Sequence, residues 1–296
     1  MVLNKVKTIG KGIQAAATSD PDTRVRRLYE LADPEKQFAH RTTRYINIGY
    51  WKDGTADPDR AGEDLALELA GIAGFEPADT VLDVGFGYGE QDFAWLRANR
   101  IHKVHGLEVT PRHVAGARAQ AESEGLRDRA DFRVGSATGL PYPDGMFDRV
   151  VALDSALHFN TRSAFFTEAL RVLKPGGVLA AIDTIPLNGA TPRATFRSAR
   201  LSLYRFSVPD ANWYDRHTYT RQLLDVGFTD PDVTSIRDRT WEGWYRYWTG
   251  LVSDPEALGK LHPEAAREFV KEWSDHRRIR REVDLLDSVT VFARKP

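Results

Sequence analysis

The stretch from residue 81 to residue 90 constrains the fold more than any other part of this chain. It reads Val81-Leu82-Asp83-Val84-Gly85-Phe86-Gly87-Tyr88-Gly89-Glu90. The apolar start is typical of a buried parallel strand, and a helical pattern begins at Glu90. Glycines at alternate positions allow positive φ angles and let a ligand lie against the backbone. Because the first N–H groups of a helix attract anionic groups, the stretch predicts a nucleotide-type site at the end of the strand.

The glycine spacing and two acidic residues indicate which kind of nucleotide binds. A dinucleotide site carries G-x-G-x-x-G, whereas this loop carries G-x-G-x-G. Asp83, inside the strand end, would repel a pyrophosphate but suits a ligand with an ammonium group. A second short strand, residues 104–108, ends at Glu108, which is placed to accept hydrogen bonds from both hydroxyls of a ribose. These features disfavour an NAD-dependent oxidoreductase.

The run from Asp83 through Gly89 to Glu108 resembles the class I S-adenosylmethionine-dependent methyltransferases. Three further segments resemble the turns before the fourth and fifth strands of that family, and the segment that covers the cofactor in its small-molecule branch. These segments are residues 140–148, 173–177 and 47–51. The resemblance covers residues 40–185 and implies S-adenosyl-L-methionine as the cofactor. Within the family it indicates the natural-product O-methyltransferases and the sterol-type C-methyltransferases.

Strand and helix patterns alternate along most of the chain. Strands are predicted at 80–83, 104–108, 130–135, 149–154, 178–183, 232–236 and 288–293, and helices at 22–32, 57–74, 90–98, 111–124, 163–173 and 218–226. This alternation predicts an α/β fold with a doubly wound, mostly parallel sheet. The resemblance implies the seven-stranded, Rossmann-like methyltransferase fold, in which the last strand is typically antiparallel.

The chain is expected to form one core with an N-terminal helical arm and helical cap insertions. Residues 1–40 are predicted to be the arm or lid, 41–186 the cofactor-binding core, 187–217 and 241–283 the cap insertions, and 218–240 and 284–296 the rest of the core. The cap segments are rich in aromatic side chains, which either form the small core of the cap or line an apolar acceptor pocket. The substrate-binding candidates in them are Trp213, Tyr214, His217 and Trp244.

Methyl transfer to a hydroxyl needs a base that removes the hydroxyl proton. His158 follows the fourth predicted strand, at the carboxyl end where α/β sheets bind their ligands. The resemblance implies a histidine facing the transferable methyl at this point, and an assisting acid at the position of Asp183 in sugar and macrolide members. A neutral imidazole can take the proton, and a carboxylate can stabilise the imidazolium. Asp154 would orient the base or contact the cofactor, and the alternative role of His158 is to cap local backbone.

The predicted cofactor site combines the glycine loop with residues that follow the next strands. Its members are Tyr50, Asp83, Gly85, Gly87, Gly89, Gln91, Glu108, Val109, Ser136, Ala137 and Asp154. Many family members carry an acid at the position of Ser136, where it holds the adenine amino group, so this chain departs from the family there. No metal ion is predicted, because the sequence shows no cluster of metal ligands. A divalent ion shared by Asp154 and Asp183 with a diol substrate is the alternative.

Composition and charge limit the partners. The 296 residues carry a formal net charge of −1 and no cysteine, which excludes disulfides, thiolate metal sites and cysteine catalysis. Balanced charge gives no bulk attraction to nucleic acid, and no apolar stretch is long enough to span a bilayer. We therefore expect a cytoplasmic protein with a small-molecule acceptor. The amphipathic first 20 residues could pack on the body, close as a lid, lie on a membrane surface or link a homodimer.

These features predict an S-adenosylmethionine-dependent methyltransferase. We expect it to O-methylate a hydroxyl of a small, largely apolar secondary metabolite of polyketide, macrolide or glycoside type, with His158 as general base. The first alternative is C-methylation of an isoprenoid or prenylated compound, in which the aromatic cap stabilises a carbocation. The second is a non-catalytic cofactor-binding protein, against which the intact glycine loop and His158 argue.

Overall fold

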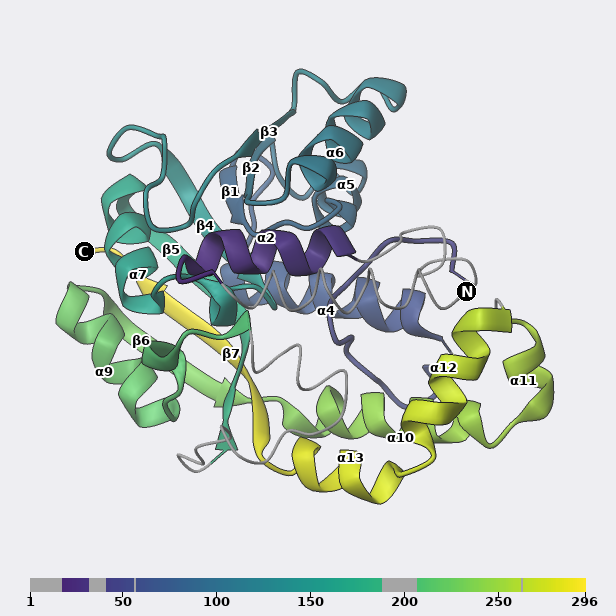
Figure 1. Ribbon diagram of the computed structural model, residues 1–296. Coiled ribbons are helices and arrows are strands. Elements are labelled where there is room, and N and C mark those ends of the chain that lie inside the picture. The colour runs from purple at the N-terminus through teal and green to yellow at the C-terminus, as the bar shows by residue number, and fades with distance from the viewer. Residues whose placement is uncertain (1–17, 32–40, 56, 188–206, 262) are drawn as a thin grey trace.

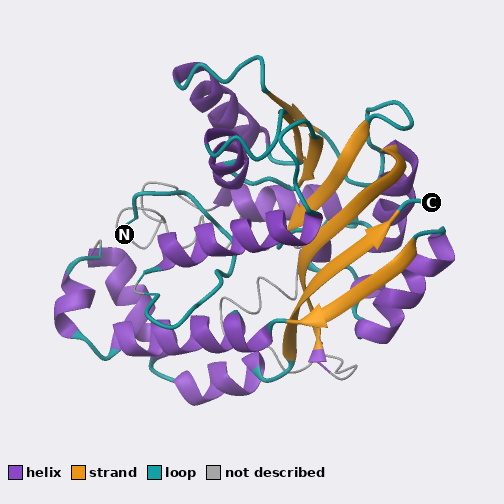
Figure 2. Cartoon of the chain, turned by 180° about the vertical axis from the view of Figure 1, so that it is seen from behind, coloured by secondary structure: helices purple, strands orange, loops and turns teal. Residues whose placement is uncertain are grey.

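A seven-stranded β-sheet forms the centre of the structure (Figures 1 and 2). The computed structural model describes residues 18–31, 41–55, 57–187, 207–261 and 263–296. The strands are β1 (Thr80–Val84), β2 (Lys103–Glu108), β3 (Ala130–Val134), β4 (Phe147–Leu153), β5 (Leu173–Pro186), β6 (Thr229–Ser235) and β7 (Leu286–Arg294). Their order is β3-β2-β1-β4-β5-β7-β6, and only β7 runs antiparallel to its neighbours within this described sheet. The predicted doubly wound, mostly parallel fold is confirmed.

Helices cover both faces of the sheet and form the cap, and the bounds of one of them, α4, follow from local sequence signals. They are α2 (Pro21–Leu31), α4 (Pro58–Ala73), α5 (Glu90–Arg97), α6 (Pro111–Ser123), α7 (Arg162–Val172), α9 (Arg216–Val226), α10 (Trp241–Val252), α11 (Pro255–Gly259), α12 (Pro263–Trp273) and α13 (His276–Val283), with short 3₁₀ turns η1 (Ala156–His158), η4 (Asp210–Asn212) and η5 (Arg237–Arg239). At the start of α4, the Asp57 side chain accepts a hydrogen bond of 2.9 Å from the Arg60 N–H. Gly74 ends the same helix in the left-handed conformation.

Alternate residues of the buried strands pack against helices on opposite faces of the sheet. Val81 of β1 belongs to a cluster with Leu65 of α4, whereas its neighbour Leu82 belongs to a cluster with Phe166 of α7. Burying one such aliphatic or aromatic side chain stabilises the fold by about 1.5–3 kcal/mol. Because both faces are covered, the strands read as continuous apolar runs rather than as alternating patterns.

The described cap helices α10 to α13 lie at the opposite end of the molecule from β3 and α6 (Figures 1 and 2). Their aromatic side chains pack on one another, and the ring centroids of Trp244 and Trp273 are 5.5 Å apart. Helix α10 also lies directly on Trp51, because a Cβ added to Gly243 would be only 2.1 Å from the Cβ of Trp51. These contacts correspond to the first of the two alternatives for the cap, a small aromatic core.

Helix α2 covers the carboxyl ends of strands β1, β2 and β4. Figure 1 shows it crossing in front of α4. Three of its side chains, Asp22, Val25 and Tyr29, face the same cavity as the last residues of those strands. Residues 1–17 and 32–40 of the expected arm, and residues 188–206 of the first cap insertion, lie outside the described residues.

Candidate active site

The glycine loop brings the backbone that follows β1 into close contact with the end of β4. Gly85 has a φ of +79°, and a Cβ added to it would lie 2.6 Å from the Cβ of Ser155. The Ser155 hydroxyl donates a hydrogen bond of 2.8 Å to the Val84 carbonyl. Any other residue at position 85 would therefore strain the backbone and displace Ser155. The result is a cradle of bare backbone.

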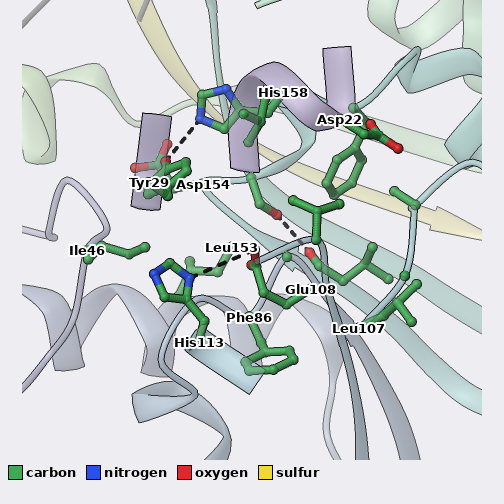
Figure 3. Close-up of a pocket in the computed structure, with 18 of the residues that line it drawn as sticks. Asp22, Tyr29, Ile46, Phe86, Leu107, Glu108, His113, Leu153, Asp154 and His158 are labelled. Atoms are coloured by element: carbon green, nitrogen blue, oxygen red, sulfur yellow. Dashed lines mark hydrogen bonds and ion pairs between the residues drawn. The ribbon is translucent and has the colours of Figure 1, made fainter. Parts of the chain in front are cut away.

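A cavity lies against this cradle at the carboxyl ends of β1, β2 and β4 (Figure 3). Its empty volume is about 760 Å³, which includes space open to solvent. Helix α2 forms its roof, and the glycine loop and strand ends form its floor. The structure brings together here these residues that the sequence analysis selects: Gly85, Gln91, Glu108, Val109, Ala137, Asp154 and His158.

Other candidates for the cofactor site do not line this cavity: Tyr50, Asp83, Gly87, Gly89 and Ser136. Asp83 is connected to the cavity through Gln91, because its carboxylate accepts a hydrogen bond of 2.9 Å from the side chain of that lining residue. The Gly87 N–H donates to the Glu108 carboxylate at 3.2 Å. The Ser136 hydroxyl is engaged by Thr138, at 3.1 Å between the two oxygens. The Lys52 ammonium lies over the Tyr50 ring, 5.9 Å from the centroid of that ring.

Glu108 ends β2 as a buried carboxylate held by backbone donors. It accepts hydrogen bonds from the N–H groups of Gly87 at 3.2 Å and Thr110 at 2.9 Å. Burial raises its pKa, although these donors act in the opposite direction. His113 of α6 lies 3.8 Å away (Figure 3), and burial lowers the pKa of that imidazole to about 4, so it is neutral at pH 7.

Both ring nitrogens of His158 have partners. Nδ1 lies 3.3 Å from the Ser207 carbonyl oxygen, and Nε2 lies 3.2 Å from the Tyr29 hydroxyl (Figure 3). A carbonyl can only accept, so the neutral ring carries its proton on Nδ1 and Nε2 accepts from Tyr29. Burial lowers the pKa of His158 to about 4. The side chain is therefore a neutral imidazole at pH 7, with the lone pair of Nε2 directed at the Tyr29 hydroxyl.

Asp154 follows β4 in a conformation that L-residues rarely adopt, with a φ of +52°. Its carboxylate accepts hydrogen bonds from the Ile48 N–H at 3.1 Å and the Thr184 hydroxyl at 3.4 Å. Burial and the nearby charge of Asp183 raise the pKa of Asp154 to about 6. Asp154 therefore joins the segment around Ile48 to the strand ends, at the wall of the cavity.

Asp183 is fully buried and does not line the cavity. One of its carboxylate oxygens accepts from Arg162 Nε at 2.6 Å and from the Tyr219 hydroxyl at 3.2 Å, and the other accepts from the Thr184 N–H at 2.9 Å. Arg162 is also fully buried, and it donates to the carbonyls of Asn212 and Thr184. This network anchors the start of α7, directly after the turn that carries His158.

The four substrate candidates lie outside the described lining of the cavity. Trp244 packs on other tryptophans of the cap. The guanidinium carbon of Arg162 lies over the Tyr214 ring, 5.0 Å from the centroid of that ring. His217 is exposed on the first turn of α9, and Trp213 is partly buried at the end of η4. Sequence reasoning missed the residues of α2 that do line the cavity.

Several side chains line this cavity that the sequence analysis does not select as site residues. Besides those of α2, they include Ile46, Asn47 and His113 of α6. Asn47 belongs to the segment 47–51, which the resemblance implies as a cover for the cofactor. A weak signal existed, since Val25 and Tyr29 share one face of the predicted helix. Nothing in the local pattern shows which element that face covers.

Comparison with known proteins identifies the family. A model described as "Methyltransferase domain" matches residues 82–181. Erythromycin 3''-O-methyltransferase of Saccharopolyspora erythraea is 41% identical over 283 residues, which are 93% of this chain and 91% of the relative. The chain belongs to the S-adenosylmethionine-dependent methyltransferases.

One further relative is named a methyltransferase, and one solved structure shares the fold. The 27-O-demethylrifamycin SV methyltransferase of Amycolatopsis mediterranei is 38% identical over 138 residues, covering 47% of this methyltransferase and 50% of the relative. The crystal structure of the [4+2]-cyclase SpnF superposes with a TM-score of 0.70 at 25% identity, covering 93% of this chain and 97% of that one. The family model and the erythromycin methyltransferase confirm the predicted family and enzyme class. Solved methyltransferase structures of the same fold contain S-adenosyl-L-methionine, which confirms the predicted cofactor.

The residues at the cavity fit this cofactor. Gly85 leaves bare backbone where a Cβ would intrude, and Glu108 is a carboxylate at the end of β2 that can accept from two ribose hydroxyls. No helix within the described ranges is long and apolar enough to cross a membrane. The same ranges contain no group of three or more His, Asp or Glu side chains that could hold a metal ion.

Proposed function

We propose that this methyltransferase O-methylates a hydroxyl of a small, largely apolar natural product of macrolide or glycoside type, with His158 as general base. The named relatives support this substrate class, because two of them act on erythromycin and on a rifamycin by name and the first spans nearly the whole chain. The test is an assay of purified protein with S-adenosyl-L-methionine and a panel of glycosylated macrolides and their aglycones. We expect a product that is heavier by one methylene and carries a new O-methyl group.

One observation carries the assignment of the base. A hydroxyl oxygen, that of Tyr29, already lies 3.2 Å from His158 Nε2 at the roof of the cavity. This distance is within the range that proton abstraction requires, so the site can present a hydroxyl to the unprotonated nitrogen. The acceptor hydroxyl would take the place of the Tyr29 phenol.

Side chains and backbone groups of the chain have different roles in the proposed methyl transfer. The cofactor, when bound, supplies the methyl group and its own leaving group. His158 takes the hydroxyl proton on Nε2, while the Ser207 carbonyl holds the proton already on Nδ1 and so fixes the tautomer. The negative charge of Asp183 favours the imidazolium that results, although the charge of Arg162, its ion-pair partner, acts in the opposite direction. The cavity under α2 would hold the acceptor in line with the transferable methyl group.

Because Tyr29 occupies the lone pair of His158, α2 has to shift before an acceptor can bind there. We expect Tyr29→Phe to lower the KM for the acceptor about 5-fold with little change in kcat, since one neutral hydrogen bond contributes about 1 kcal/mol. Steady-state kinetics measures this. Tyr245→Phe, which removes a tyrosine hydrogen bond in the cap, is the matched control. A lower kcat in Tyr29→Phe would show that the phenol assists the reaction rather than competing with the acceptor.

The cofactor site yields a second prediction for this function. We expect Glu108→Gln to weaken the binding of S-adenosylhomocysteine about 10- to 100-fold, because hydrogen bonds to a charged group contribute about 1.5–3 kcal/mol. Calorimetry measures the dissociation constant. Glu124→Gln, which alters an ion pair with Arg97 on the surface, should leave it unchanged. Normal affinity in Glu108→Gln would remove Glu108 from the ribose site.

The C-methylation alternative depended on aromatic side chains around the reacting carbon. In the described structure, the aromatic residues of α10 pack within the cap and against Trp51 rather than along the cavity. The position of the new methyl group, read by NMR of the product, distinguishes O- from C-methylation. We further propose that the enzyme is cytoplasmic and does not bind nucleic acid. The net charge of −1 supports the second of these proposals.

A further inference from the structure

Two buried carboxyl groups lie under the glycine loop. Asp83 of β1 and Asp92 in the first turn of α5 are both 0% exposed. A Cβ added to Gly89 would lie 3.5 Å from Asp92 Oδ2, which places this carboxyl against the third glycine of the loop. No ion pair joins either carboxyl to a basic side chain in the described residues. A buried carboxylate without a cation is strongly disfavoured, so this pair needs an explanation.

The hydrogen bonds around the pair are incomplete if both groups are ionised. Asp83 Oδ2 accepts from Gln91 Nε2 at 2.9 Å. No donor within the described part of the chain reaches Asp83 Oδ1 or either carboxyl oxygen of Asp92. A carboxylate can only accept, whereas a protonated carboxyl also donates. One proton on Asp92 therefore lets the two groups hydrogen-bond to each other.

The groups that face the pair from neighbouring elements do not neutralise it. Burial raises the pKa of Asp83 to about 7, against the hydrogen bonds from Gln91 and Asp92, and the charge of Glu108 on β2 adds to the increase. His113 of α6 contacts Glu108 and is neutral, and Gln91 of α5 carries no charge. Tyr45 donates its hydroxyl to the Glu90 carbonyl. Neighbouring side chains therefore supply no positive charge to Asp83 and Asp92 in the described structure, and a bound ligand can supply it.

We propose that Asp83 and Asp92 share one proton in the cofactor-free enzyme and release it when S-adenosyl-L-methionine binds, which makes Asp92 a positioning residue of the cofactor site. The O–H bond of Asp92 breaks, and the proton passes to the buffer. The cofactor carries an ammonium and a sulfonium group against one carboxylate, so it brings the net positive charge that the pair lacks. Gln91, which lines the cavity and holds Asp83, joins the pair to the ligand.

The demethylated product carries no sulfonium and is neutral overall, so it should displace fewer protons. As pH rises, the coupling therefore strengthens binding of the charged cofactor more than binding of its neutral product. By linkage, each proton released on binding increases the affinity about tenfold per pH unit. The proposal concerns the cofactor alone and does not depend on the acceptor or on the role of His158.

Calorimetry in two buffers with different protonation enthalpies tests this, because the difference in heat counts the protons released. For S-adenosyl-L-methionine at pH 7 we expect about one proton in the wild type and almost none in Asp92→Asn. The amide of that variant still donates to Asp83 but has no proton to lose. Asp64→Asn is the control, since Asp64 is buried but paired with Lys52 and Arg60.

Two outcomes would overturn the proposal: no proton release in the wild type, or equal release in Asp92→Asn. Equal release would assign the proton to Glu108 or Asp154, which also have raised pKa values near the cavity. If Asp92→Asn does not fold, infrared difference spectra of the wild type decide instead. Binding should remove the C=O band of a protonated carboxyl, and a spectrum without that loss would contradict the proposal.

Discussion

Replacing His158 with alanine should lower kcat about 10²- to 10⁴-fold, which is the usual contribution of a general base. An aliphatic hydroxyl is a poor nucleophile until it is losing its proton, and Nε2 of His158 is the unprotonated nitrogen that faces a hydroxyl in the cavity. Affinity for S-adenosylhomocysteine should stay unchanged, because the loop and Glu108 are untouched. Stopped assays with saturating acceptor measure kcat, and calorimetry measures the affinity.

Two variants control for the loss of a histidine side chain. His158→Gln keeps polar atoms near Ser207 but cannot act as a base at neutral pH, so it should be nearly as slow as His158→Ala. His217→Ala removes an exposed histidine from α9 and should be as active as the wild type. Near-normal turnover in His158→Ala would assign proton removal to water or to Asp154, which also lines the cavity.

The pH dependence provides an independent check on His158. Burial lowers the pKa of this imidazole to about 4, and only the neutral form can accept a proton. The part of kcat that depends on this base should therefore be constant above about pH 6 and fall as the pH drops through about 4. A midpoint near 6.5, the value for an exposed histidine, would show that the ring is solvated during turnover.

The glycine loop and the strand pattern allow the core of the fold to be predicted from the sequence. The alternation of buried strands and helices follows from hydrophobic periodicity, and Gly74 and Asp57 mark the ends of α4 by local chemistry. The same logic places Glu108 and His158 at strand ends, where parallel sheets bind ligands. These inferences succeed because each depends on residues that are near one another in the sequence.

The roof of the cavity could not be predicted in this way. Tyr29 and His158 are 129 residues apart, and their contact depends on how α2 packs across the sheet. The aromatic residues of α10 show the same limit, because helical spacing puts them on one face without showing what that face covers. Here it covers Trp51 and the other cap helices, and the close approach at Gly243 is visible only in three dimensions.

Asp183→Asn should destabilise the protein by about 3–5 kcal/mol, because it removes one partner of a buried ion pair and leaves the other charge without compensation. Arg162 and Asp183 are both 0% exposed, and their closest atoms are 2.6 Å apart. Denaturant unfolding measures the free energy. Glu124→Gln, at a surface pair with Arg97, should cost no more than about 1 kcal/mol.

A double variant separates the ion pair from its surroundings. Arg162→Met combined with Asp183→Leu removes both charges, so it should be more stable than either single variant. The stability of the double variant should stay below that of the wild type, since Tyr219 and the carbonyls of Asn212 and Thr184 lose their partners.

The folded fraction of Asp183→Asn should lose less kcat than His158→Ala, because Asp183 acts on the imidazolium only through its charge. Stability close to the wild type in Asp183→Asn would contradict the buried pair, and additive single effects would contradict its coupling.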